Sequence, residues 1–202
     1  MSRLGVFGYG SLVSRDSVAA TLGRDAAPPL PARLAGWHRR WSIFRDNKRV
    51  EKEFERLDGQ PFRHCLGLNL ERAPEAAEAE WPNGALIEVT RAELDRLDLR
   101  ELRYDRVDVS EGIRTGSGAC AGGGGTFDAV YAFVAKPEHF APETPPRSII
   151  IASYLRACEE AFDQLGPGER DLFAATTGPP PVPVVEARLV RDAIPKGNPR
   201  DW

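Results

Sequence analysis

The pattern of apolar and polar positions divides the chain into short strands and a few helices. Apolar runs and apolar–polar alternation predict a strand that begins at Leu4 and further strands over residues 32–44, 65–70, 84–89, 103–109, 127–135 and 182–190. Helical spacing and helix-boundary residues predict helices over residues 14–22, 91–101, 149–165 and 169–175. Residues 46–60 are polar and predict a loop or a weak helix. Together these elements predict an α+β fold whose strands pair mostly antiparallel.

The first predicted strand runs directly into the turn Gly8-Tyr9-Gly10-Ser11. Glycine on both sides of Tyr9 lets the backbone approach a ligand closely and turn its N–H groups outward. Such a turn can hold a carboxylate or an oxyanion without any charged side chain. The alternative is an ordinary strand-ending turn with Tyr9 packed beneath it, because short glycine-rich motifs often carry no function.

A carboxylate stands at the end of the predicted helix 91–101. Leu94 and Leu97 mark the inner face of this helix, and Glu101 falls on the same face, seven residues after Leu94. If it is partly buried there, its pKa is raised, which suits proton transfer near neutral pH. The alternative is that the helix ends one residue early and that Glu101 pairs with Arg100 or Arg103 at the surface. The pattern alone leaves both interpretations open.

Composition and charge narrow the classes of function. The 202 residues are 42% hydrophobic and 28% charged, which is typical of one globular domain over residues 1–202. A Pro-rich segment and an edge strand are expected from about residue 178. The net charge of −3 indicates neither a nucleic-acid partner nor an acidic membrane, and no apolar run is long enough to span a membrane. The basic residues between Arg39 and Arg49 are followed by acidic residues between Glu51 and Asp58, and this balance of charge favours a solvated surface.

The residue types that bind metals are scattered. Cys65, Cys120 and Cys158 lie far apart, and the three histidines are isolated in the sequence. This pattern argues against a disulfide framework and favours a reduced, cytoplasmic protein. The glycine cluster at residues 121–125 lacks the Lys and Ser/Thr of a phosphate loop, so it predicts a flexible hairpin connection. We therefore expect neither a metal nor a cofactor.

Three segments have the form of motifs that occur together in one known family. The first is Val6-Phe7-Gly8-Tyr9-Gly10-Ser11-Leu12. The second is Leu97-Asp98-Leu99-Arg100-Glu101, followed by Tyr104-Asp105-Arg106-Val107-Asp108-Val109. The third is Ala132-Phe133-Val134-Ala135-Lys136-Pro137, followed by Ser153-Tyr154-Leu155. Spanning about residues 4 to 177, these segments resemble the gamma-glutamylcyclotransferase-like superfamily, which includes the ChaC-type branch.

The resemblance implies a small mixed β-barrel flanked by helices, and it implies release of 5-oxoproline from a gamma-glutamyl compound. In that reaction the α-amine of the substrate attacks its own γ-carbonyl, so no protein nucleophile, metal or cofactor is required. The resemblance assigns the role of general base and acid to Glu101. It assigns substrate binding to Tyr9, Gly10, Ser11, Leu12 and Tyr154. The expected partner is a small gamma-glutamyl molecule.

Two questions stay open at this point. One is whether the chain turns substrate over, because a binding or regulatory protein of the same fold is the alternative. The other is the leaving amine, which can belong to glutathione, a gamma-glutamyl amino acid, a gamma-glutamylamine or a biosynthetic intermediate. The half of the substrate that differs among these is expected to contact residues 45–60 and 112–126. The oligomeric state is equally open.

Overall fold

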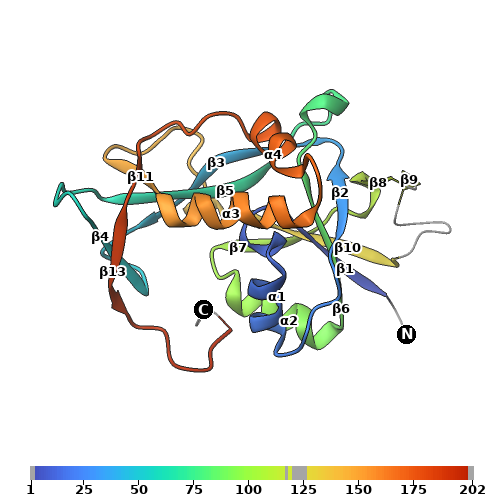
Figure 1. Cartoon of the computed structure of the whole chain (residues 1–202), viewed down its shortest axis with the longest axis horizontal. Helices are drawn as coiled ribbons and strands as arrows, with labels where there is room; N and C mark the ends of the chain where they lie inside the picture. The colour runs from blue at the N-terminus through green and yellow to red at the C-terminus, as the bar shows by residue number, and fades with distance from the viewer. Residues whose placement is uncertain (1–2, 117, 120–126, 200–202) are drawn as a thin grey trace.

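In the computed structural model, which describes residues 3–116, 118–119 and 127–199, the first strand lies inside a seven-stranded sheet (Figure 1). The strand order is β7-β10-β1-β6-β2-β8-β9. Their bounds are β1 Leu4–Gly8, β2 Leu30–Leu34, β6 Asn83–Val89, β7 Tyr104–Asp108, β8 Ile113–Thr115, β9 Gly118–Ala119 and β10 Ala129–Ala135. β1 pairs with β10 parallel and with β6 antiparallel, and all of its residues are buried, as its apolar run predicts.

Two further sheets complete the β structure. One has the order β12-β11-β5-β3, with bounds β3 Trp37–Asp46, β5 His64–Arg72, β11 Ser148–Ile151 and β12 Val184–Val185. The other pairs β4 (Lys52–Arg56) antiparallel with β13 (Ala187–Asp192). Most pairings among the described strands are antiparallel, as predicted, but the three sheets do not close into a barrel. The α+β class is therefore confirmed and the barrel is not.

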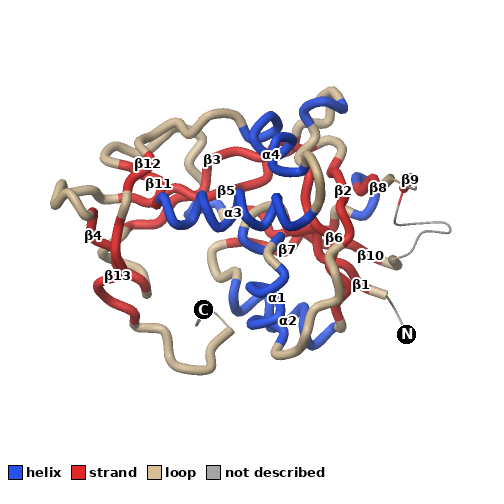
Figure 2. Tube along the Cα trace, in the orientation of Figure 1, coloured by secondary structure: helices blue, strands red, loops and turns tan. Residues whose placement is uncertain are grey.

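Four α-helices flank the sheets among the described residues (Figure 2). They are α1 Arg15–Leu22, α2 Arg91–Arg100, α3 Ala152–Leu165 and α4 Glu169–Thr177, with 3₁₀ turns at η1 Ser11–Val13, η2 Glu78–Glu80, η3 Ser110–Gly112 and η4 Pro137–His139. Ser14 caps the start of α1, and Gly23 ends it in the left-handed conformation. Thr90 and Glu93 form the capping box that starts α2. α1 and α2 pack against each other, and α3 crosses the middle of the molecule (Figure 1).

Three sequence predictions are corrected by pairing between distant segments. The strand predicted over residues 32–44 is two strands, because the chain turns at Gly36 with a φ of 77°. The polar segment 46–60 contains the strand β4, which forms because β13 supplies a partner from the end of the chain. The helix predicted over 149–165 begins as β11, where three consecutive isoleucines lie between β5 and β12.

The glycine cluster at residues 121–125 lies outside the described residues, as does Cys120. The described thiols of Cys65 and Cys158 are both free and buried. None of the helices that the structure describes is long and apolar enough to cross a membrane.

Candidate active site

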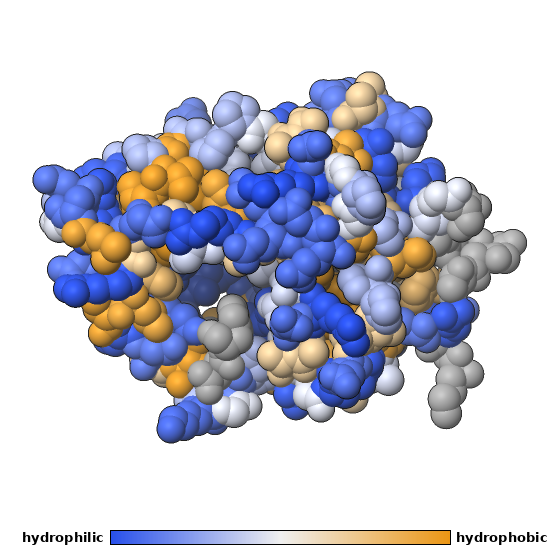
Figure 3. All heavy atoms as spheres, in the orientation of Figure 1, coloured by the Kyte–Doolittle hydropathy of each residue, from blue (hydrophilic) through white to orange (hydrophobic). Residues whose placement is uncertain are grey.

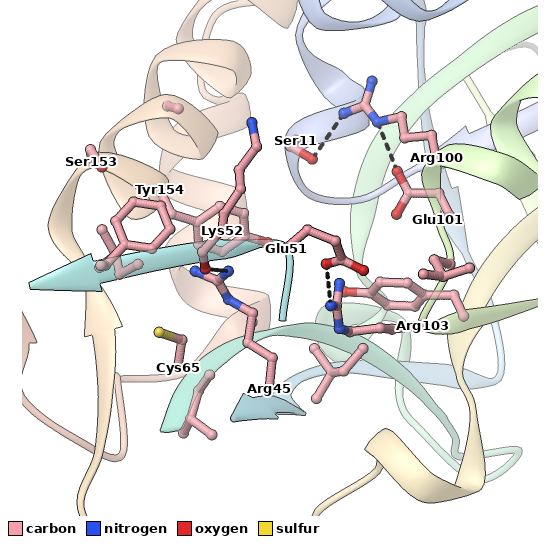
Figure 4. Close-up of a pocket in the computed structure, with 18 of the residues that line it drawn as sticks. Ser11, Arg45, Glu51, Lys52, Cys65, Arg100, Glu101, Arg103, Ser153 and Tyr154 are labelled. Atoms are coloured by element: carbon pink, nitrogen blue, oxygen red, sulfur yellow. Dashed lines mark hydrogen bonds and ion pairs between the residues drawn. The ribbon is translucent and has the colours of Figure 1, made fainter. Parts of the chain in front are cut away.

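A cavity of about 510 Å³ opens where the second sheet, the end of α2 and the start of α3 meet. Figure 3 shows the surface hollowed between β13 and α1. β3 and β5 form one wall, β4 and β13 a second, and the segment that follows α2 a third. Glu101 and Tyr154, both expected in the site from the sequence, line this cavity together with Ser11 (Figure 4). Three segments that are far apart in the sequence therefore meet here, as the resemblance implied.

A second, smaller recess of about 30 Å³ adjoins the cavity, because both are lined by Ser11, Glu101, Tyr104 and Tyr154. Its other walls include the backbone segment from Tyr9 to Leu12. A recess of this size has room for one water molecule or one oxygen atom of a ligand. All five residues predicted to bind substrate, and Glu101, therefore lie around one recess.

The loop from Gly10 to Leu12 lines this recess and carries unpaired backbone N–H groups. The turn is closed by hydrogen bonds from Val13 N to Gly10 O at 2.9 Å and from Ser14 N to Ser11 O at 3.3 Å. Within the described chain, no acceptor pairs with the backbone N–H of Gly10, Ser11 or Leu12. Neighbouring N–H groups of this kind form a concave site for an anion or a developing oxyanion.

Two glycines allow this loop to lie where it does. A Cβ atom on Gly8 would stand 2.7 Å from the carbonyl oxygen of Leu12, so the loop could not fold back over the strand. A Cβ atom on Gly10 would stand 3.3 Å both from Leu68 Cδ1 and from the hydroxyl oxygen of Tyr154. The bare Cα of Gly10 therefore brings the loop against the Tyr154 hydroxyl, which comes from the first turn of α3.

The side chains of Tyr9 and Leu12 belong to the core instead of the cavity surface. The Tyr9 hydroxyl donates a hydrogen bond of 2.5 Å to the carbonyl oxygen of Phe133, and the ring is buried. Leu12 is also buried, in the cluster that holds Leu94 and Leu97. The interpretation of Tyr9 as packed beneath the turn is confirmed for its side chain.

Glu101 combines the two alternatives that its sequence position left open. The helix α2 ends at Arg100, so Glu101 is its C-cap, and the Glu101 N–H donates to the carbonyl oxygen of Leu97 at 2.8 Å. The Glu101 side chain is nevertheless only 15% exposed, and its Oε1 lies 2.9 Å from Nε of Arg100. Burial raises the pKa of Glu101, while the charges of Arg100 and Arg103 lower it to a smaller extent.

Arg100 ties Glu101 to the loop and to α1. Its guanidinium is fully buried, and burial lowers its pKa against the opposing effect of Glu101. It donates to Ser17 O at 2.9 Å, Ser17 Oγ at 2.7 Å, Thr21 Oγ1 at 2.6 Å and Ser11 Oγ at 3.3 Å. A cation with this many fixed acceptors has little freedom to move. The Glu101 carboxylate is therefore held beside the loop by a rigid partner.

Sequence reasoning missed Arg39, which it placed on a solvated surface. Arg39 is fully buried, and its guanidinium carbon lies 5.1 Å and 4.4 Å from the centres of the Phe162 and Phe173 rings, which stack on each other. It donates to Tyr9 O, Asn83 O, Asn83 Oδ1, Phe173 O, Thr176 Oγ1 and Thr177 Oγ1, at 2.7 to 3.3 Å. Burial lowers the pKa of Arg39 to about 9, which leaves it cationic at neutral pH. Its bond to Tyr9 O supports the loop from below.

Two more lining residues were not predicted individually as site residues. Tyr104 follows the helix end, lines both cavities and donates a hydrogen bond to Leu68 O at 3.0 Å. Arg45 lines the larger cavity from the end of β3. The segment 45–60 contributes further lining residues, as expected, but residues 112–116 line neither cavity. Tyr104 lies in a motif that already carried the resemblance, whereas no local signal distinguishes Arg45 from the surface arginines nearby.

The described residues bring together no group of three or more His, Cys, Asp or Glu side chains that could hold a metal ion. The chemistry available at the site is that of one buried carboxylate, a set of backbone N–H donors, two phenols and several guanidinium groups. This set can move a proton and stabilise negative charge on oxygen.

The arrangement of sheets and helices is that of the gamma-glutamyl cyclotransferase-like fold, which confirms the resemblance at the level of the fold. A solved structure described as a gamma-glutamyl cyclotransferase superposes with a TM-score of 0.56 at 14% identity, over 91% of this chain and 94% of that one. A gamma-glutamyl cyclotransferase specific to glutathione, from yeast, superposes with a TM-score of 0.52 at 16% identity, over 87% of this chain and 96% of its own. No protein-family model and no curated protein sequence matches the chain.

Proposed function

We propose that this protein is a gamma-glutamylcyclotransferase, which cyclises the glutamyl half of a gamma-glutamyl compound to 5-oxoproline and releases a free amine. The observation that supports the proposal is the position of Glu101. Its carboxylate is buried, is held by Arg100, and lines the same recess as the unpaired N–H groups of Gly10 to Leu12. The fold shared with gamma-glutamyl cyclotransferases agrees with this assignment.

The proposed reaction needs one proton acceptor that later becomes a proton donor. Glu101 takes a proton from the α-ammonium of the substrate, and the free amine nitrogen attacks the γ-carbonyl carbon of the same molecule. The carbonyl oxygen becomes an oxyanion, which the N–H groups of Gly10, Ser11 and Leu12 stabilise. Glu101 returns the proton to the leaving nitrogen, and the bond from the γ-carbon to that nitrogen breaks. The attacking nitrogen, now bonded to the γ-carbon, loses its second proton by way of Glu101 to the departing amine, which leaves as an ammonium ion. No water is consumed, and the carboxylate ends in the state in which it began.

The cavity contributes binding and shape as well as a base. The open glutamyl chain must fold until its amine approaches its own carbonyl, and binding at the mouth of the recess, with the carbonyl oxygen inside it, supplies that proximity. The Tyr154 hydroxyl lies against Gly10, and we assign to it a hydrogen bond to the glutamyl group. Burial raises the pKa of Glu101, which makes its carboxylate a better acceptor for the substrate proton.

The test is incubation of the purified protein with a panel of gamma-glutamyl peptides and amines, with 5-oxoproline measured by chromatography. Release of 5-oxoproline that the Glu101→Gln variant does not catalyse supports the proposal. Binding of a gamma-glutamyl compound without any release would instead assign the chain to the binding class. Release that is unchanged in the variant would remove Glu101 from the mechanism.

A further inference from the structure

One guanidinium in the cavity is not balanced by a carboxylate, and it lies away from the recess that we assign to the γ-carbonyl oxygen of the substrate. We propose that Arg45 binds a carboxylate on the leaving half of the substrate. The substrate is then a gamma-glutamyl amino acid or peptide with a free carboxylate, and not a gamma-glutamylamine. This inference rests on the proposed function and adds the chemistry of the leaving group to it.

The charges that line the cavity single out Arg45. The cations are Arg45, Lys52, Arg100 and Arg103, and the carboxylates are Glu51 and Glu101. Three of the cations have an anionic partner: Arg100 with Glu101 at 2.9 Å, Arg103 with Glu51 at 2.6 Å, and Lys52 with Asp192 at 3.4 Å. Among the described residues, no carboxylate lies within ion-pair distance of Arg45. The cavity therefore presents one positive charge that a ligand can neutralise.

The neighbours of Arg45 are neutral groups that hold it in place. Its Nη1 donates to the carbonyl oxygen of Lys52 at 3.2 Å, and its guanidinium carbon lies 4.9 Å from the centre of the Phe54 ring. Burial raises the pKa of the Cys65 thiol, and the positive charge of Arg45 opposes that rise. A guanidinium stacked on a ring still presents N–H donors at its edges, in a fork that matches a carboxylate.

The position of Arg45 fits the leaving half of the substrate. The small recess is lined by the loop and Glu101, whereas Arg45, Phe54 and Cys65 line only the larger cavity. Figure 4 places Arg45 and Cys65 across the cavity from Arg100 and Glu101. A substrate whose γ-carbonyl oxygen occupies the recess has its glutamyl half at the mouth of the recess and extends its other half into the space that Arg45 faces.

Tyr104 interacts electrostatically with residues of both the recess and the larger cavity. Burial and the negative charge of Glu101 raise the pKa of the Tyr104 hydroxyl, and the charges of Arg103 and Arg45 lower it to a smaller extent. The Tyr104 hydroxyl is therefore within electrostatic reach of both Glu101 and Arg45. Tyr104 also lines both the recess and the larger cavity, so one ligand can extend from the recess into the larger cavity beside it.

Charge complementarity favours substrates whose leaving half carries a carboxylate. The glutamyl half carries one ammonium and one carboxylate, so its own charges cancel. A further carboxylate on the leaving half neutralises Arg45, whereas a leaving half that carries an ammonium is repelled by it. The carboxylate can belong to the first residue after the gamma-glutamyl bond or to a second one, because each added residue extends the reach by about 3.5 Å.

The experiment compares substrates that differ only in that carboxylate. The pairs are gamma-glutamyl-alanine with gamma-glutamyl-alaninamide, and gamma-glutamyl-alanyl-glycine with its C-terminal amide. Each is assayed for 5-oxoproline release by the wild type, Arg45→Gln, Arg45→Lys and Arg40→Gln. Arg40 is exposed on the same strand and lines neither cavity, so its variant is a control for the loss of one charge.

We expect the wild type to prefer the acid over its amide by about 10-fold to 100-fold in kcat/KM, the scale of a charge-assisted hydrogen bond. Arg45→Gln should bring that ratio close to one by slowing only the acid, Arg45→Lys should keep part of it, and Arg40→Gln should keep all of it. The pair that shows the preference identifies which residue carries the recognised carboxylate. Equal activity of the wild type on acid and amide in both pairs would overturn the inference, as would equal losses on acid and amide in Arg45→Gln.

The design separates this inference from the proposed function. If the wild type releases no 5-oxoproline from any substrate, the proposed function fails, and calorimetric binding of the same pairs decides the role of Arg45 by itself. An acid preference in binding that Arg45→Gln removes supports the subsite, and binding without that preference, or no binding, contradicts it. If Arg45→Gln does not fold, the wild-type ratio and the Arg45→Lys variant decide whether Arg45 recognises the carboxylate.

Discussion

Replacing Glu101 with glutamine tests the assigned chemistry most directly, because glutamine keeps the shape of the side chain and removes its titrating group. The variant loses the acceptor for the α-ammonium proton and the donor for the leaving amine. Loss of a general acid–base group lowers turnover by about 10² to 10⁴-fold, or about 2.7 to 5.4 kcal/mol in the barrier. Substrate binding should change little, since most of the proposed glutamyl contacts come from the backbone of Gly10 to Leu12 and from Tyr154, and glutamine can still accept a hydrogen bond from the α-ammonium. We therefore expect a fall in kcat with a nearly unchanged KM.

The effect of the same substitution on stability follows from its pairing with Arg100. The raised pKa of Glu101 means that its ionisation costs stability as the pH rises through the folded-state pKa, and glutamine removes this cost. The substitution also has a cost, because the buried guanidinium of Arg100 loses its anionic partner. The glutamine oxygen can still accept a hydrogen bond from Arg100, whose Nε lies 2.9 Å from Glu101 Oε1. Breaking a buried pair costs about 3–5 kcal/mol. Because Arg100 keeps four other hydrogen bonds, we expect a loss at or below the lower end of that range.

The assay is 5-oxoproline release under saturating and limiting substrate, together with the calorimetric affinity for a gamma-glutamyl peptide and a urea unfolding curve. The matched control is Asp98→Asn, which removes the same charge from the same helix. Asp98 lines neither cavity and pairs with Arg106 at 3.0 Å. The assigned role of Glu101 is refuted if folded Glu101→Gln retains more than about a tenth of the wild-type kcat, or if Asp98→Asn loses as much.

Three further outcomes are expected. Gly10→Val should lower 5-oxoproline release at least 10-fold, because its Cβ atom alone would stand 3.3 Å from Leu68 Cδ1 and would disturb the loop. The protein should stay folded, and unchanged kinetics would exclude the loop from the site. Burial raises the pKa of Glu101, and its ionised form is the base, so kcat should fall as the pH is lowered through that raised pKa. A kcat that stays constant down to about pH 4.3, the ordinary pKa of glutamic acid, would contradict the assignment. Arg39→Met should lower the free energy of unfolding, measured by urea denaturation, by about 3 kcal/mol or more, because it leaves buried acceptors unpaired. The control Arg40→Met, at an exposed position, should change it by less than about 0.5 kcal/mol.

Much of the site could be predicted from the sequence because its main parts are local. The strand that begins at Leu4 and the turn after it are formed by consecutive residues, and the loop residues line the recess in the structure. The capping box and the spacing of Leu94 and Leu97 fix the start and the inner face of α2, and hence the approximate direction of Glu101. Helix period and cap chemistry act within a few residues, so they can be read without knowing the fold.

Only the tertiary structure decided what depends on contacts between distant segments. β4 is a strand because β13, more than a hundred residues later, pairs with it, and the isoleucines before α3 form a strand because β5 is beside them. Arg39 and Arg45 lie on one strand and look alike in the sequence, yet one is enclosed by α4 and Asn83 while the other faces the cavity. A basic residue shows no local sign of whether acceptors, aromatic rings or solvent will surround it, because those partners are assembled only when the sheets and helices pack together.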